Sequence, residues 1–323
     1  MKIINNHKLS IKLLSVSLTV FSVLMTINLF VRSSTFNNIP YNYNCITDTS
    51  QYIYIIHALQ IPDSLKFAGE KVPLNKTYIR ESYDREISIN TYWHSQTILL
   101  IKRANRYFPV IEPILKEYGI PDDFKFLAMI ESSLMPKAIS PAGAAGIWQF
   151  MKDSAKEYGL EVSTDIDERY HLEKATEAAC KYLKKAYSKY GSWTLAAAAY
   201  NAGTGGIDKQ IARQKTNNYY DLLLNEETSR YIFRILALKQ ILASPKEYGF
   251  YLTEDDLYKP VPYFEIEIKE TIDDFADFAM EQGVTYRELK ELNPWLREPF
   301  LKNSAKKSYF IKIPKPNAFI INL

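Results

Sequence analysis

The spacing of apolar residues changes near Pro245, and this change limits the folds open to the chain more than any other feature. From Ile87 to Leu242 the pattern is helical, and glycines follow several of the apolar runs. After Pro245, residues 263–268 and 308–313 alternate between apolar and polar as half-buried strands do. We therefore predict a mainly α fold: a helical domain and a small C-terminal α+β module of strand-helix-helix-strand order.

The predicted helices of the large domain are separated by turn residues. They cover residues 88–107, 109–118, 151–158, 171–190, 192–200, 207–214 and 228–243. A further helix follows Pro121, which suits the first helical position, and Asp122 and Asp123 suit the first turn because carboxylates complement the positive end of the helix dipole. In the C-terminal module, the second helix is predicted over 285–292.

The N-terminus carries a signal for export. Lys2, Lys8 and Lys12 precede an uncharged run over residues 13–31. Such a run is typical of a secretory signal peptide or of a membrane anchor, and both interpretations stay open. We predict that residues 1–34 form this segment, and that the protein is exported to the periplasm or cell envelope, with possible anchoring through residues 13–31.

The composition argues against several kinds of partner and site. A formal charge of +3, from 40 basic and 37 acidic side chains, does not indicate nucleic acid. The glycine-rich residues 203–206 lack the Gly-Lys-Ser/Thr of a phosphate-binding loop, so we predict a turn and no nucleotide. Cys45 and Cys180 allow at most one disulfide, and the four histidines show no ligand spacing. We therefore predict no metal and no cofactor.

Glu131 is the first candidate for a chemical role. In the helix after Pro121, Phe124, Leu127 and Ala128 form an apolar stripe that Glu131 continues. Burial of a carboxyl beside apolar side chains raises its pKa, which lets it act as a general acid near neutral pH. The other interpretation is a glutamate at the helix end that simply faces solvent.

Three short stretches further along the chain offer groups suited to a sugar. A glycine-rich turn presents Trp148 and Gln149, and an aromatic ring beside an amide matches the apolar faces and polar edges of a sugar. A packed turn with a buried Trp148 is the alternative. A helix rich in alanine ends at Tyr200 and Asn201, and Tyr231 lies one turn inside the last long helix. All three side chains can form hydrogen bonds.

The order and spacing of these motifs resemble the lytic transglycosylases of the goose-type lysozyme superfamily. The matching motifs are Glu131-Ser132, Gly146-Ile147-Trp148-Gln149, Ala199-Tyr200-Asn201-Ala202-Gly203 and Glu227-Thr228-Ser229-Arg230-Tyr231. The resemblance implies a lysozyme-like helical domain, predicted over 87–245. Residues 35–86 are then a linker and wrapping arm.

The resemblance also implies the reaction and the roles of the residues. The enzyme is expected to cut peptidoglycan strands between N-acetylmuramic acid and N-acetylglucosamine, leaving a 1,6-anhydro end. Glu131 is the expected catalytic residue, first as acid and then as base, because the substrate supplies its own acetamido group and C6 hydroxyl. Ser132, Trp148, Gln149, Tyr200, Asn201 and Tyr231 are the expected substrate-binding residues.

The C-terminal module, predicted over 260–316, resembles a lysin-motif (LysM) domain. The matching segments are Ile272-x-x-Phe275-Ala276, Gly283-Val284-Thr285, Leu289-Lys290-Glu291-Leu292-Asn293 and Ile311-Lys312-Ile313-Pro314. The usual Gly-Asp-Thr opening is replaced by Lys269-Glu270-Thr271. Glycan binding by the module, and a structural or partner-docking role, therefore both stay open.

Two other functions remain possible at this point. A lysozyme-like hydrolase normally needs a second carboxylate and would leave a reducing end. A non-catalytic peptidoglycan-binding or assembly protein could use the same scaffold, although a buried Glu131 would then serve no purpose.

Overall fold

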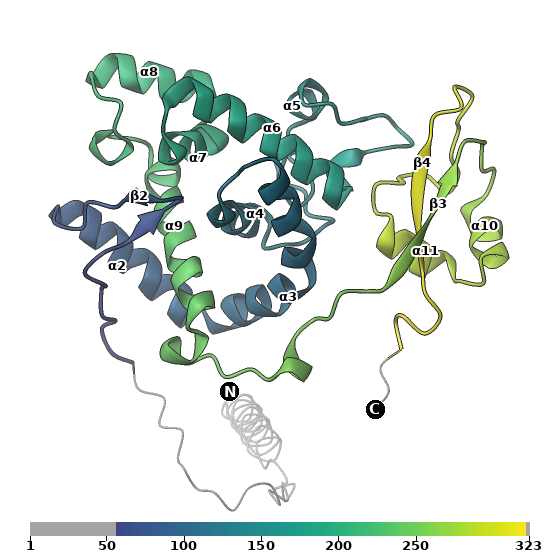
Figure 1. Ribbon diagram of the computed structural model, residues 1–323, viewed down its shortest axis with the longest axis horizontal. Coiled ribbons are helices and arrows are strands. Elements are labelled where there is room, and N and C mark those ends of the chain that lie inside the picture. Colours follow the sequence, from purple (N-terminus) through teal and green to yellow (C-terminus); the bar gives the residue numbers. More distant parts are fainter. Residues whose placement is uncertain (1–55, 321–323) are drawn as a thin grey trace, which may run out of the picture. The chain divides into compact units, whose positions relative to one another are not determined.

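A computed structural model describes residues 56–320 of the chain (Figure 1). The predicted signal or anchor over residues 1–34, and Cys45, lie outside the described residues. Within residues 56–320, no helix is both long enough and apolar enough to cross a membrane.

The described chain is mainly helical and has a strand-helix-helix-strand module, as predicted, and it has two small antiparallel sheets, of which β1–β2 was not predicted. The helices are α2 (Thr77–Tyr92), α3 (His94–Glu117), α4 (Lys125–Ser132), α5 (Lys152–Glu157), α6 (Leu172–Tyr190), α7 (Trp193–Ala202), α8 (Thr204–Gln214), α9 (Glu226–Ala243), α10 (Phe275–Glu281) and α11 (Tyr286–Leu292). The strands are β1 (Lys66–Phe67), β2 (Glu70–Lys71), β3 (Tyr263–Ile268) and β4 (Tyr309–Pro314), paired β1 with β2 and β3 with β4.

The first two helices differ from the prediction. The break lies at Trp93, whose backbone leaves the helical region between α2 and α3, instead of near Phe108. Helix α3 continues through Pro109 and Pro113. A proline inside a helix removes one hydrogen bond and costs stability, but the buried face of α3 runs on past both prolines to Leu115, and this burial offsets the cost.

The end of the predicted linker and arm belongs to the folded body. Phe67 of β1 and Val72, directly after β2, are fully buried, and the Phe67 ring packs edge-on against Phe124, with 5.3 Å between ring centroids. Helix α2 starts at Thr77, inside the segment 35–86, and packs along α9 (Figure 1). The two-residue strands are too short for an alternating pattern to predict them, and the part of α2 before Ile87 was not predicted.

The helical core surrounds α4. This short helix contacts α3 and α9, while α6 and α7 pack on each other and on α3 and α9 (Figure 1). Residues 203–206 are not the predicted turn, because only Gly203 has a positive φ, and α8 begins directly at Thr204. The small side chains of α7 are fully buried, which allows this close packing.

The C-terminal module has the predicted order of strand, two helices and strand. Strands β3 and β4 pair from Tyr263 with Pro314 to Ile268 with Tyr309. Helix α11 starts at a capping box, in which Thr285 and Glu288 satisfy each other's backbone N–H groups.

Candidate active site

Helix α4 carries Glu131 near its C-terminal end. Pro121 does not begin this helix; it precedes a short 3₁₀ turn, Asp122–Phe124, after which α4 starts at Lys125. Leu127 and Ala128 are fully buried, as predicted from the stripe. Glu131 continues the stripe to its partly exposed edge, and the helix ends directly afterwards at Ser133, which has a positive φ.

The surroundings of Glu131 favour its protonated form. Burial raises the pKa of Glu131 to about 7, and the nearby Glu227 carboxylate acts in the same direction. The Tyr231 hydroxyl donates a hydrogen bond to Glu131 Oε1. This bond and the positive charge of Arg234 stabilise the carboxylate and limit the rise in pKa. A carboxyl with this pKa can hold a proton, or take one up, near neutral pH.

Trp148 is not placed where a sugar could contact it. Its side chain is 0% exposed, its indole N–H donates to Thr176 Oγ1 at 2.8 Å, and its ring packs edge-on against Tyr200. The prediction of direct sugar contact is therefore corrected in favour of the packed turn. A flat, mainly apolar ring of this size gains more from burial behind the turn than from exposure on it.

Gln149 lies on the partly exposed side of the same turn, with a positive φ of 50°. Its amide nitrogen donates to Gly146 O at 2.7 Å. The side-chain nitrogen is therefore engaged in holding the turn, and the side-chain oxygen is the group left for a ligand.

Tyr200 and Asn201 lie at the C-terminal end of α7. The Tyr200 hydroxyl donates to the carbonyl of Trp148 at 2.7 Å, so it links α7 to the turn. Asn201 donates to Glu227 Oε1 at 3.2 Å and accepts from Thr228 Oγ1 at 2.7 Å. Asn201 thus connects α7 to the start of α9.

Ser132 and Tyr231 are buried, and only Tyr231 reaches Glu131. Ser132 Oγ donates to the carbonyl of Ala128 at 3.3 Å, one turn earlier in α4. This arrangement does not present Ser132 to a ligand, contrary to the prediction, because its position on α4 points into the core. Tyr231 is 1% exposed, and its hydroxyl is used by Glu131.

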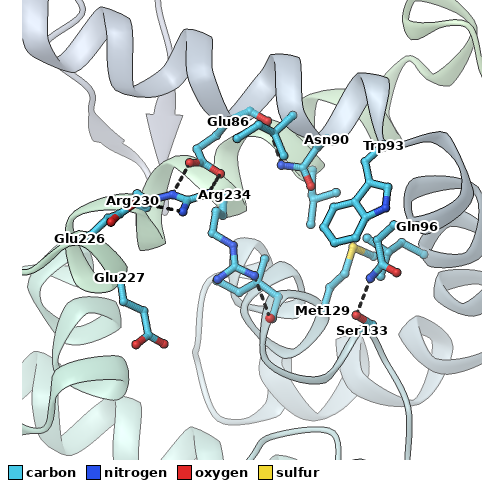
Figure 2. Close-up of a pocket in the computed structure, with 14 residues that line it drawn as sticks. Glu86, Asn90, Trp93, Gln96, Met129, Ser133, Glu226, Glu227, Arg230 and Arg234 are labelled. Atoms are coloured by element: carbon cyan, nitrogen blue, oxygen red, sulfur yellow. Dashed lines mark hydrogen bonds and ion pairs between the residues drawn. The ribbon is translucent and has the colours of Figure 1, made fainter.

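A cavity of about 510 Å³ lies beside α4, between α2, α3 and α9 (Figure 2). Its lining includes Ile130, the residue before Glu131, and two residues that influence the Glu131 pKa, Glu227 and Arg234. Figure 2 shows Trp93 and Glu227 at opposite ends of the cavity. The Trp93 side chain is 60% exposed, which is unusual for so large an aromatic group.

Two arginines in the wall of this cavity are held by polar groups of neighbouring helices. The buried Glu86 carboxylate pairs with the Arg230 guanidinium, with 2.6 Å between Oε1 and Nε. Arg234 donates to the carbonyl of Ile130 at 3.3 Å (Figure 2). These contacts tie α9 to α2 and to α4.

Sequence reasoning assigned no role to the residues of this cavity, although Glu227 and Arg230 belong to a matching motif. Glu227 and Arg234 lie four residues before and three residues after Tyr231, so helical spacing places them on the same side of α9. That spacing could have identified Glu227 and Arg234 as neighbours of Tyr231 in the site. Nothing in the sequence indicated Trp93, because its exposure depends on the break between α2 and α3.

Other reactive groups lie away from this site. Cys180 is fully buried, and burial raises the pKa of its thiol to about 12. Between residues 56 and 320, no cluster of His, Cys, Asp and Glu is arranged to hold a metal ion.

Comparison with known families identifies two matches along the chain. Residues 109–223 match the family described as Transglycosylase SLT domain. Residues 264–317 match the Soluble lytic transglycosylase C-terminal LysM-like domain. Both agree with the motifs in the sequence, and the first agrees with the predicted lysozyme-like helical class.

Several proteins are similar in sequence or structure. Membrane-bound lytic murein transglycosylase D of Escherichia coli K12 is 30% identical over 263 residues, which cover 80% of this chain and 55% of that protein. Membrane-bound lytic murein transglycosylase F of Pseudoalteromonas translucida is 27% identical, covering 47% of this chain and 32% of that protein. The crystal structure of the 70 kDa soluble lytic transglycosylase of Escherichia coli aligns with 48% of this chain and 27% of that one, at 20% identity and a TM-score of 0.38. The chain spans about half the length of the first of these relatives.

Proposed function

We propose that this chain, which carries a transglycosylase SLT domain followed by a LysM-like domain, cleaves the glycan strands of peptidoglycan as a lytic transglycosylase. The observation that carries the proposal is Glu131. It is a carboxyl within the matched residues 109–223, its pKa is raised to about 7, and it accepts a hydrogen bond from Tyr231. Its neighbour Ile130 lines the cavity.

In the first step, protonated Glu131 gives its proton to the glycosidic oxygen between N-acetylmuramic acid and N-acetylglucosamine. The bond from that oxygen to C1 of the muramic acid breaks, and the acetamido oxygen of the same sugar stabilises the positive charge at C1. Burial supports this step, because it keeps the carboxyl protonated near neutral pH.

In the second step, the Glu131 carboxylate takes the proton of the C6 hydroxyl as that oxygen attacks C1. A 1,6-anhydro ring forms, and Glu131 is protonated again. The hydrogen bond from Tyr231 and the charge of Arg234 support the carboxylate that exists between the steps. One carboxyl is enough for this sequence.

We propose that Gln149 and Asn201 hold acetamido or hydroxyl groups of the sugar. Both are partly exposed and come from different elements that meet around Tyr200. Trp148 and Ser132 act behind them by packing. The exposed Trp93 ring offers a further sugar an apolar face at the far end of the cavity.

The hydrolase remains a second candidate because a second carboxylate, Glu227, lies near Glu131. In a hydrolase, Glu227 would activate water, and its loss would abolish cleavage. In a transglycosylase, the Glu227→Gln variant keeps its anhydro product. The identity of the new end therefore distinguishes the two reactions.

The site of action is proposed to be the cell envelope, where peptidoglycan lies. Two relatives named above are described as membrane-bound. Residues 13–31 would direct export or hold the protein at a membrane.

The test is digestion of purified cell wall, with mass spectrometry of the products. The wild-type protein is expected to release 1,6-anhydro ends. Glu131→Gln is expected to lose about 10²-fold or more of the rate while keeping the Tyr231 contact. Glu157→Gln, at an exposed position of α5, is the control and keeps full activity. Undiminished lysis by Glu131→Gln, or reducing ends from the wild type, would overturn the proposal.

A further inference from the structure

The C-terminal module is joined to the helical domain by backbone hydrogen bonds. Asp167 N donates to the carbonyl of Trp295 at 2.9 Å, and Arg297 N donates to the carbonyl of Asp165 at 2.8 Å. Ile166 and Leu296 form an antiparallel bridge between them. A short strand of the helical domain is therefore paired with the module, and such a contact permits little sliding.

The two domains also share one buried cluster at this contact. Ala145, Ile166 and Tyr170 of the helical domain belong to the same apolar cluster as Trp295 and Leu296 of the module. A module that moved freely would expose this cluster to water.

The segment held by the module contains Arg169, which is buried. Its guanidinium donates to the Asp167 carboxylate from Nε, at 2.9 Å to Oδ1 and 3.3 Å to Oδ2, and from Nη2, at 2.7 Å to Oδ2. The same side chain donates to Gly143 O at 2.8 Å and to Phe150 O at 3.1 Å. Arg169 therefore holds both ends of the turn 143–150 with one rigid group.

The Arg169 backbone lies against the middle of that turn as well. A Cβ atom at Gly146 would come within 1.8 Å of Arg169 O, so the two backbones are packed as closely as glycine allows. On its other side, the turn meets the active site, where Trp148 O accepts the hydrogen bond from Tyr200. Contacts thus run from the module through the segment around Arg169 and the turn 143–150 to Tyr200 of α7.

We infer that the C-terminal module is a fixed brace for the turn 143–150, and that Arg169 is the positioning residue through which it acts. The module's contribution is to hold Gln149 where the substrate needs it. This inference rests on the proposed function for its effect on catalysis. Its effect on the turn itself does not depend on that function.

Two variants of the full chain test the inference, with hydrogen exchange of backbone amides as the first measurement. Arg169→Lys keeps the charge but cannot bond Asp167 and both carbonyls together. We expect amides of residues 143–150 to exchange about tenfold faster, with α9 unchanged. Arg213→Lys, at an exposed position of α8, is the matched control.

The second variant tests the module side of the contact. The Arg297 guanidinium lies over the Tyr170 ring, 4.3 Å from its centroid, and the residue is exposed, so we expect Arg297→Ala to fold. We expect Arg297→Ala to speed exchange in the same turn about threefold. Unchanged exchange in Arg169→Lys would overturn the whole inference. A change in Arg169→Lys alone would overturn the part played by the module.

The catalytic measurement separates positioning from plain loss of folded protein. With soluble glycan oligomers as substrate, Arg169→Lys is expected to raise KM severalfold, because Gln149 is displaced. A smaller folded fraction would lower kcat at constant KM, and that result would contradict the positioning role. If wild-type protein cut no glycan at all, the proposed function would fail while the exchange result still stood.

Discussion

At the scale of single residues, the site depends on how Glu131 is surrounded. Burial and the Glu227 carboxylate raise the pKa, whereas Tyr231 and Arg234 oppose the rise. The two opposing sets leave the carboxyl close to half protonated at neutral pH. An acid that must become a base in the next step needs this balance.

The rate of cleavage should depend on pH through Glu131. Because the acid step needs the protonated carboxyl and its pKa is about 7, kcat/KM should fall as the pH rises above 7. The measurement is kcat/KM for soluble glycan oligomers from pH 5 to 9. A flat profile between pH 6 and 8 would contradict the assignment.

Tyr231→Phe should move this profile in a known direction. The hydrogen bond from Tyr231 lowers the pKa of Glu131, so its removal leaves the carboxyl protonated to higher pH. The pH at which kcat/KM falls on the high-pH limb should therefore be higher than in the wild type. Tyr219→Phe, which removes a buried hydroxyl bonded to the backbone of α9, is the control and should leave the limb in place.

Glu131 should also affect stability. Its pKa in the folded protein, about 7, exceeds the ordinary value of 4.5, so the folded state binds more protons between these pH values. The free energy of unfolding then falls as the pH rises from 4.5 to 7, by about 3 kcal/mol. Urea unfolding of Glu131→Gln should match the wild type near pH 4.5 and show greater stability at pH 8. Equal stability at pH 8 would count against burial of the charge.

At the scale of elements, the turn 143–150 joins the site to the rest of the fold. In this turn the Trp148 side chain packs into the core, and Gln149 has a positive φ. Gly146 allows the close approach of Arg169 O and also has a positive φ, 78°. The turn is thus shaped by a neighbour that lies well apart in the sequence.

Replacement of two glycines in this turn separates backbone strain from steric contact. Gly146→Ala would place Cβ 1.8 Å from a backbone oxygen, whereas Gly143→Ala, at a φ of 87°, meets nothing within 4 Å. We expect about 1–2 kcal/mol of destabilisation for Gly143→Ala and at least about 2 kcal/mol more for Gly146→Ala. Urea unfolding measures both. Equal losses would show that the close contact does not matter.

At the scale of the whole described chain, the helical domain and the C-terminal module meet at a second contact, which is a cluster of charged side chains. Glu173 at the start of α6 pairs with the buried Lys312 of β4, and its Oε2 lies 3.3 Å from His171 Nδ1. Although burial alone would raise it, His171 and Lys312 lower the pKa of Glu173 to about 2. The Tyr263 hydroxyl lies 3.4 Å from the same carboxylate.

This cluster predicts how the protein responds to acid. Since the pKa of Glu173 is lowered from 4.5 to about 2, its contribution to stability is present above pH 4.5 and is lost as the pH falls toward 2. Partial exposure reduces that contribution to about 2 kcal/mol. Lys312→Met should raise this pKa, so that the loss begins at higher pH. Urea unfolding between pH 2 and 6, with the exposed Lys302→Met as control, measures the difference.

Much of the fold followed from short-range patterns. Helices α5 to α9 and the strand-helix-helix-strand order lie where periodicity and glycines placed them. The predicted boundary before Pro109 did not form, because buried contacts along α3 continue the helix through this proline, and the break lies at Trp93 instead. The hairpin near Phe67 escaped prediction since its strands are only two residues long.

Four ordered motifs predict that Glu131 shares one site with Gln149, Tyr200, Asn201 and Tyr231, because motif order and spacing can be read along the chain. How each side chain is used depends on the folded chain. In the folded chain the side chains of Trp148 and Ser132 are buried in the core. Arg169 donates a hydrogen bond to the turn that carries Gln149. The physical reason is that exposure and hydrogen-bond partners depend on segments far apart in the sequence, such as α9 for Glu131 and the C-terminal module for the segment around Arg169.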